Sequence, residues 1–144
     1  RAAQGGEFTF RYVITSGGSF DPSSLSRLAW EHLRPVEINY VMPQDKVGNP
    51  DRPLPAEGAS FLEMDAPNVV LGTWKLAEDG NGTILRFYET AGHETTSTLR
   101  FTRHAPSSAQ LCNAVEDNLA PFEVQGASIQ LRFRPNEIVT LRIR

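Results

Sequence analysis

The chain has 144 residues, the size of one domain, and a domain of this length buries about 68–70% of its unfolded surface on folding. Its 14 Lys and Arg against 17 Asp and Glu give a net charge of −3, so no basic excess favours nucleic acid as a partner. Cys112 is the only cysteine, which excludes an internal disulfide, and no apolar run approaches the roughly 20 residues of a membrane-spanning helix.

The first residues predict one strand and one short helix. Residues 7–15 alternate apolar and polar side chains with a period of two, which predicts a strand whose buried face carries Phe8, Phe10, Tyr12 and Ile14. Asp21 can cap a helix and Pro22 suits its first position, so we expect a short helix that begins there and ends at Pro35.

The rest of the chain predicts a β-sandwich. Residues 43–60 hold four prolines and two glycines and little apolar content, which is typical of a long surface loop. Short strand patterns follow at close spacing, and their number indicates an antiparallel β-sandwich. We therefore expect a single all-β domain over residues 1–144 with one short helix near the N-terminus. The strand patterns lie at 60–64, 68–76, 82–89, 96–103, 109–116, 127–133 and 137–144.

The last two strand patterns alternate most clearly. In 127–133 the apolar residues alternate with Gln130 and Arg132, and in 137–144 they alternate with Thr140 and Arg142. Each strand is therefore expected to have one buried and one solvent-exposed face.

Two acidic pairs raise the question of a catalytic site. Glu78 and Asp79 precede Gly80 and Gly82, and Asp-Gly and Asn-Gly dipeptides between strands favour a hairpin turn. Adjacent side chains in an extended chain point to opposite sides, which disfavours the facing carboxylates of a glycosidase. The pair Glu116–Asp117 has the same interpretation, at a strand end.

Metal and nucleophile motifs are missing from the sequence. His32, His93 and His104 lack the spacing of a catalytic zinc site. The glycines before Ser19 match neither a nucleophile elbow nor a phosphate loop. We therefore predict no catalytic residue and no metal ligand in this chain.

The aromatic residues leave open a sugar-binding function. Aromatic side chains on one face of a sandwich could stack against sugars, although aromatic residues on strands more often pack in the core. Trp74 is in phase with the apolar residues of its strand and Trp30 lies beside the apolar stripe of the helix, so packing is the expectation for both. The other candidates are Tyr12, Tyr40 and Tyr88.

Arg86 lies in a strand pattern whose two faces are both apolar. Such a strand is either central in a sandwich and covered on its outer side, or docked against another domain. A guanidinium in this place is expected to pair with a carboxylate, either of Glu78, Asp79 or Glu89 or of the other domain. The candidates for a binding or interface role are therefore Glu78, Asp79, Arg86 and Tyr88.

Two stretches carry a resemblance to a known family. Residues 55–94, "PAEGASFLEMDAPNVVLGTWKLAEDGNGTILRFYETAGHE", resemble the C-terminal β-domain of family 38 α-mannosidases, with its "pNVvL", "KkAEDG" and "lilRlYE" motifs. The closing "PNEIVTLRIR" is similar to that family's "pfEI.TlrL" ending. The start of the chain is a looser match, since Ser16 and Gly17 stand where the family often has a Pro-His pair.

The resemblance implies a parent enzyme that hydrolyses α-mannosides with retention. It implies a carboxylate nucleophile and a zinc ion on an N-terminal catalytic barrel, which would be this domain's partner in the same polypeptide, whereas this chain would do no chemistry. The "KxAEDG…LRxYE" motif resembles the bacterial and cytosolic or vacuolar branch of the family, which implies a cytoplasmic, bacterial protein. The chain begins at Arg1 and shows no signal peptide, so we expect it to be a piece of a longer protein. The alternative is a freestanding carbohydrate-binding sandwich.

Overall fold

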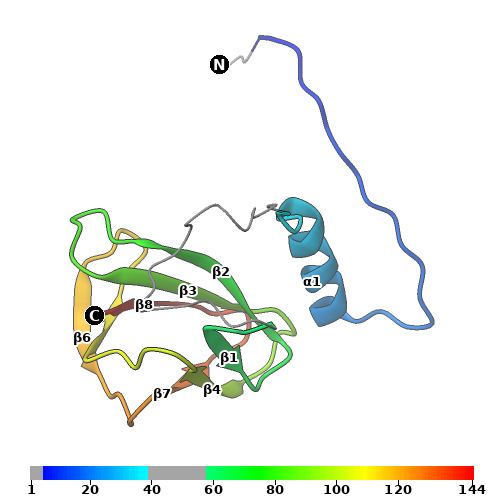
Figure 1. The fold of residues 1–144 in the computed structure, drawn as a ribbon. Helices are drawn as coiled ribbons and strands as arrows, with labels where there is room; N and C mark the ends of the chain where they lie inside the picture. The colour runs from blue at the N-terminus through cyan, green and yellow to red at the C-terminus, as the bar shows by residue number, and fades with distance from the viewer. Residues whose placement is uncertain (1–4, 39–57) are drawn as a thin grey trace, which may run out of the picture.

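The computed structural model describes residues 5–38 and 58–144 of the chain. Within these described residues, one helix precedes eight strands (Figure 1). The elements are α1 (Pro22–Leu33), β1 (Leu62–Met64), β2 (Val69–Leu76), β3 (Thr83–Glu89), β4 (Thr95–Phe101), β5 (Ala109–Cys112), β6 (Asn118–Phe122), β7 (Ser128–Phe133) and β8 (Ile138–Ile143).

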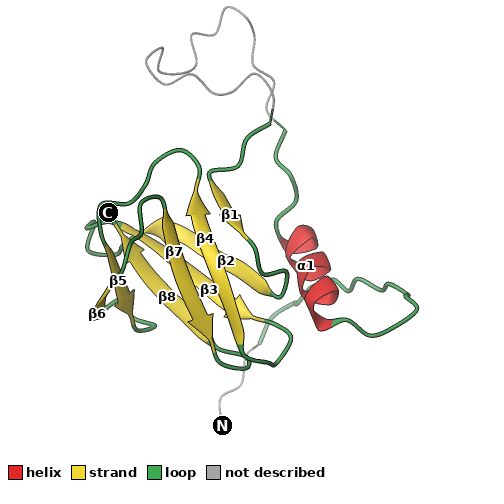
Figure 2. Cartoon of the chain, turned by 90° about the horizontal axis from the view of Figure 1, so that it is seen from below, coloured by secondary structure: helices red, strands yellow, loops and turns green. Residues whose placement is uncertain are grey.

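The strands form two antiparallel sheets, which confirms the predicted all-β sandwich. A three-stranded sheet has the order β1-β4-β7, and a five-stranded sheet has the order β2-β3-β8-β5-β6. Figure 2 shows the smaller sheet lying across the larger one, with α1 beside the sandwich. β3 is a central strand, paired with β2 on one side and with β8 on the other.

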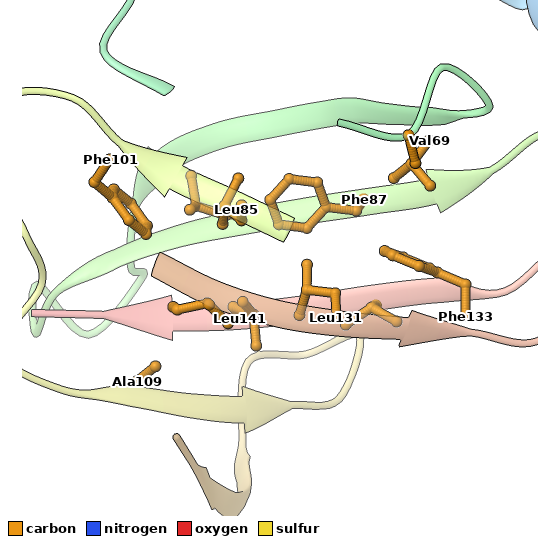
Figure 3. Packing of buried hydrophobic residues seen from close by; sticks show 12 residues of the cluster. Val69, Leu85, Phe87, Phe101, Ala109, Leu131, Phe133 and Leu141 are labelled. Carbon is orange, nitrogen blue, oxygen red and sulfur yellow. The ribbon is translucent and has the colours of Figure 1, made fainter. Parts of the chain in front are cut away.

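The hydrophobic core fills the space between the sheets. Figure 3 shows Leu85 and Phe87 of β3 gathered with Leu131 and Phe133 of β7, and all four are buried. The predicted alternation in β7 is confirmed, since its apolar residues are buried while Gln130 and the arginine two positions after it are exposed. Burial of such side chains, at about 25 cal/mol per Å² of apolar surface, is the main force that holds the sheets together.

The predicted helix is confirmed with its cap. The Asp21 carboxylate accepts hydrogen bonds from the N–H groups of Ser23 and Ser24 at 3.1 and 3.3 Å, and Pro22 occupies the first turn. The guanidinium of Arg27 donates to the Pro67 carbonyl through Nε and Nη2 at 3.2 and 2.9 Å, which ties the helix to the sandwich. Within the described residues, this helix is neither long nor apolar enough to cross a membrane.

Seven of the eight strands coincide with the predicted patterns, and β6 does not. β6 contains Pro121, which has no backbone N–H to donate. Its residues also do not alternate between apolar and polar side chains, so the sequence shows no strand pattern there. The strand is possible because it lies at the edge of the five-stranded sheet, paired only with β5. The predicted strand at 109–116 is correspondingly shorter, because its last residues form the β5–β6 turn, residues 113–117.

The strand predicted at residues 7–15 is wrong for this structure. These residues are extended and exposed and pair with no described strand (Figure 1). The physical reason is that alternation makes a strand possible, but a strand also needs a neighbouring edge for its backbone hydrogen bonds. Most of the loop predicted at residues 43–60 lies outside the described residues; only 58–60 are described, and they are exposed and irregular.

Candidate functional site

The β2–β3 hairpin ends in a tight turn, as predicted from its glycines. The N–H of Ala77 donates to the Gly82 carbonyl at 3.0 Å, and the N–H of Gly80 donates to the Ala77 carbonyl at 2.9 Å. Gly80 and Gly82 have φ values of 72° and 97°, a region that side chains rarely tolerate. We call residues 77–82 the hairpin tip.

Arg142 on β8 holds the hairpin tip through Asp79. Its Nη1 donates to both oxygens of the Asp79 carboxylate, at 2.8 and 2.6 Å, and to the Asn81 carbonyl at 3.0 Å. The guanidinium of Arg142 and, secondly, the N–H of Asn81 lower the pKa of Asp79 below its usual value. This carboxylate is therefore ionised and already engaged by a cation of its own sheet.

The expectation that Arg142 lies on a solvent-exposed face is wrong. Only 4% of the residue is accessible, and Thr140 on the same face is equally buried. Its Nη2 donates to the Glu116 carbonyl at 2.8 Å, because the β5–β6 turn folds over this side of the sheet. Alternation reports which side of a strand a residue faces, but not what covers that side.

Glu116 joins the β5–β6 turn to the hairpin tip. Its side chain is buried, with one oxygen 2.6 Å from Lys75 Nζ and the other accepting the Glu78 N–H at 2.9 Å. The Lys75 ammonium, followed by the Glu78 N–H, lowers the pKa of Glu116, and Glu116 followed by Glu78 raises the pKa of Lys75. Sequence reasoning treated Glu116 as an ordinary turn residue, and its positive φ of 70° is invisible in the sequence.

Glu78 and Asp79 do not form a facing pair of carboxylates. The Glu78 side chain is exposed and reaches Lys75 at 3.2 Å, while Asp79 reaches Arg142. A hollow of about 270 Å³ lies between the hairpin tip and the β5–β6 turn. It is lined by Glu78, Asp79, Val115, Glu116, Asp117, Asn118 and Arg142.

Arg86 pairs with no carboxylate among the described residues, so the predicted pairing with Glu78, Asp79 or Glu89 is wrong, and a carboxylate from another domain stays a prediction. The Nε of Arg86 donates to Thr140 Oγ1 at 3.1 Å and its Nη2 donates to the Ala114 carbonyl at 2.9 Å. The prediction that both faces of β3 are covered holds for Ile84 and Leu85, which are fully buried. The β5–β6 turn covers the outer side of β3 at Arg86, as the first alternative predicts for this part of the strand, whereas Tyr88 on the same side is partly exposed.

Glu89, offered as a partner for Arg86, has a different role. It is fully buried and accepts four hydrogen bonds, at 2.7 to 2.9 Å, from the Asn68 amide and the N–H groups of Ala91, Gly92 and Asn136. Burial alone would raise its pKa, but the donors, led by the Asn136 N–H and the Asn68 amide, outweigh it and lower the pKa of Glu89 to about 2. Glu89 thus anchors the β3–β4 and β7–β8 turns.

The aromatic candidates divide between packing and exposure. Trp30 packs as predicted, since a methyl group on Gly72 of β2 would lie 3.4 Å from its ring. Trp74 does not, because it lies on the edge strand β2 and is 51% exposed. Tyr88 is 39% exposed on β3, away from the hairpin tip.

The described residues contain no group of three or more His, Cys, Asp or Glu side chains placed to hold a metal ion. A zinc site of the kind that the resemblance implies therefore does not fit the side chains of residues 5–38 and 58–144.

The chain was compared with known proteins. A search of curated proteins found no match. The model of the glycosyl hydrolases family 38 C-terminal beta sandwich domain matches residues 68–141, which is just over half of the chain and extends from the residue before β2 into β8. The chain therefore belongs to this family, as a C-terminal β-sandwich domain of the family 38 glycosyl hydrolases.

Proposed function

We propose that this chain is a non-catalytic domain of an α-mannosidase and supports the N-terminal catalytic barrel of the same polypeptide. The match of residues 68–141 to the family's C-terminal sandwich carries the proposal. Cleavage of the α-mannoside, with zinc held in the barrel, belongs to that other part of the enzyme. The free and buried Cys112 is compatible with a cytoplasmic, bacterial enzyme, and we include this location in the proposal.

The surroundings of the Asp79 and Glu116 carboxylates support a structural role for this domain. A glycosidase needs one carboxylic acid with a raised pKa, so that it can protonate the leaving oxygen. In Asp79 and Glu116 the pKa is instead lowered by Arg142 and Lys75. Both carboxylates are held ionised by cations of the sandwich, which suits them to bracing the hairpin tip and not to proton transfer.

Assays of the purified chain and of the enzyme that contains it test the proposal. We expect the enzyme to cleave an aryl α-mannoside, with turnover lost on chelation and restored by zinc. The chain alone should show no turnover and no stoichiometric zinc by elemental analysis. Chelator-sensitive turnover by the chain alone would refute the non-catalytic role, and an enzyme without α-mannosidase activity would refute the substrate.

A freestanding carbohydrate-binding module is the second candidate. The half-exposed Trp74 favours it, because this ring lines an apolar hollow of about 380 Å³ together with Phe61 of the segment before β1. An exposed ring of this kind could stack on a sugar. Calorimetric titration of the chain with mannose and mannobiose separates the two: binding that Trp74→Ala abolishes supports the module, and an absence of binding supports the accessory domain.

A further inference from the structure

Residues 7–15 have the side-chain pattern of a strand and an extended backbone, but no partner in the described chain. The apolar side chains of the predicted buried face are largely exposed, with Phe10 at 72% and Ile14 at 94%. Isolated apolar side chains on a surface are ordinary, but a row of them along one face of an extended segment marks an interaction surface.

The backbone of this segment is equally unsatisfied. Among the described residues, those from 7 to 15 take part in no strand pairing and in no backbone hydrogen bond. An apolar face combined with a row of free N–H and C=O groups is complementary to one kind of surface, the edge of a β-sheet above an apolar layer. A flat apolar groove would cover the side chains and leave the backbone unpaired.

The adjoining helix, α1, also exposes apolar side chains to solvent. No residue of α1 is fully buried, and its contacts with the sandwich run through Arg27, Trp30 and Ser23. Leu33 at its end is 70% exposed, and Phe20 just before it is 81% exposed. The strand-like segment and the outer side of the helix are consecutive in the chain, so one partner can cover both.

The sandwich itself does not take up this segment. The helix is tied to Pro67 before β2 and to Thr90 after β3, which fixes the point from which the preceding residues leave. From there the segment runs away from both sheets (Figure 1).

We propose that residues 7–15 form a β-strand that adds to the edge of a sheet in another domain of the same hydrolase. Phe8, Phe10, Tyr12 and Ile14 would face that domain's core, and the outer side of α1 would pack against the same domain. This inference rests on the proposed function, in which the sandwich belongs to a larger enzyme. The segment precedes the residues that match a C-terminal domain, on the side where the preceding part of such an enzyme joins.

A partner in the same polypeptide also explains how so short a strand can be held. A tether raises the effective concentration of the partner into the millimolar range for a short linker, so that one strand and one helix face suffice. A second copy of this chain would have to bind through the same short segment without that advantage.

Hydrogen–deuterium exchange of the amides of residues 8–14 tests the inference, in the isolated chain and in the enzyme that contains it. We expect exchange at the rate of a free peptide in the isolated chain, and at least about 100-fold slower exchange in the enzyme. Phe10→Ser in the enzyme should restore fast exchange, and Arg11→Ser on the opposite face should not. Fast exchange in the wild-type enzyme would overturn the inference, and so would protection of the isolated chain that grows with its concentration, which identifies a second copy.

Activity on an aryl α-mannoside, measured on the same samples, separates this inference from the proposed function. Slow exchange in an enzyme without α-mannosidase activity would support the strand and refute the substrate. Fast exchange in an active α-mannosidase would refute the strand and leave the proposed function in place.

Discussion

Asp79 at the tip of the β2–β3 hairpin is bound by Arg142 of β8, with Nη1 at 2.8 and 2.6 Å from its two carboxylate oxygens. The two residues are 63 positions apart in the chain. The same guanidinium also binds the carbonyls of Asn81 and Glu116. Arg142 therefore connects the hairpin tip, the last strand and the β5–β6 turn.

Arg142→Ala should lower the melting temperature more than Arg86→Ala does. The first change leaves Asp79 and two carbonyls without their cation, while the second removes only bonds to a hydroxyl and one carbonyl. Arg132→Ala on the exposed face of β7 is the matched control and should stay within about 0.5 kcal/mol of the wild type. Thermal melts of the three variants check the order.

Asp79→Ala combined with Arg142→Ala should destabilise the chain by less than the sum of the single changes, because each single change already breaks the pair. Strict additivity of the two changes in a chemical denaturation series would contradict a direct interaction between them.

Glu89→Gln should make the folding stability of the chain less dependent on pH in the acidic range. The pKa of Glu89 is lowered to about 2 in the folded chain, from an ordinary value of 4.5. Its contribution is therefore complete above about pH 4.5 and is lost as the pH falls toward 2. The variant should melt below the wild type at pH 7, with a gap that narrows under acid. A gap that stays constant from pH 7 to pH 2.5 would show that the Glu89 charge has no stabilising role.

Gly82→Ala should be more disruptive than Gly80→Ala, although both glycines have positive φ values. A methyl group at position 82 would lie 2.6 Å from the Ile143 carbonyl oxygen, whereas nothing lies within 4 Å at position 80. Gly80→Ala should cost about 1–2 kcal/mol from backbone strain alone, and Gly82→Ala should cost more. Urea titrations measure both values, and equal costs would mean that the hairpin tip can move away from β8.

Phe87→Ala should destabilise the sandwich by about 3–5 kcal/mol, because this ring is fully buried between the sheets. Trp74→Ala removes a larger ring but one that is half exposed, so this change should lower the free energy of unfolding by less. Chemical denaturation of the two variants compares them. A larger loss for Trp74→Ala would place that ring in the core, as its phase along the strand suggested.

Local patterns alone predicted the helix, the hairpin turn and most of the strands. Asp21 and Pro22 mark the helix start, and Gly80 and Gly82 mark the turn, because capping and positive φ depend on the residue itself and its nearest neighbours. The alternation in β7 predicted its buried face for the same reason. The motifs of residues 55–94 also carried the resemblance that the family match confirmed.

Tertiary structure decided where each polar group finds its partner. Arg142 and Glu116 look like surface residues in sequence, yet both are buried, because the β5–β6 turn crosses the outer side of the sheet. Residues 7–15 show the opposite case, a strand pattern for which the described chain supplies no edge. Side-chain periodicity is a local property, whereas burial, ion pairing and strand pairing depend on segments that only folding or another domain brings alongside.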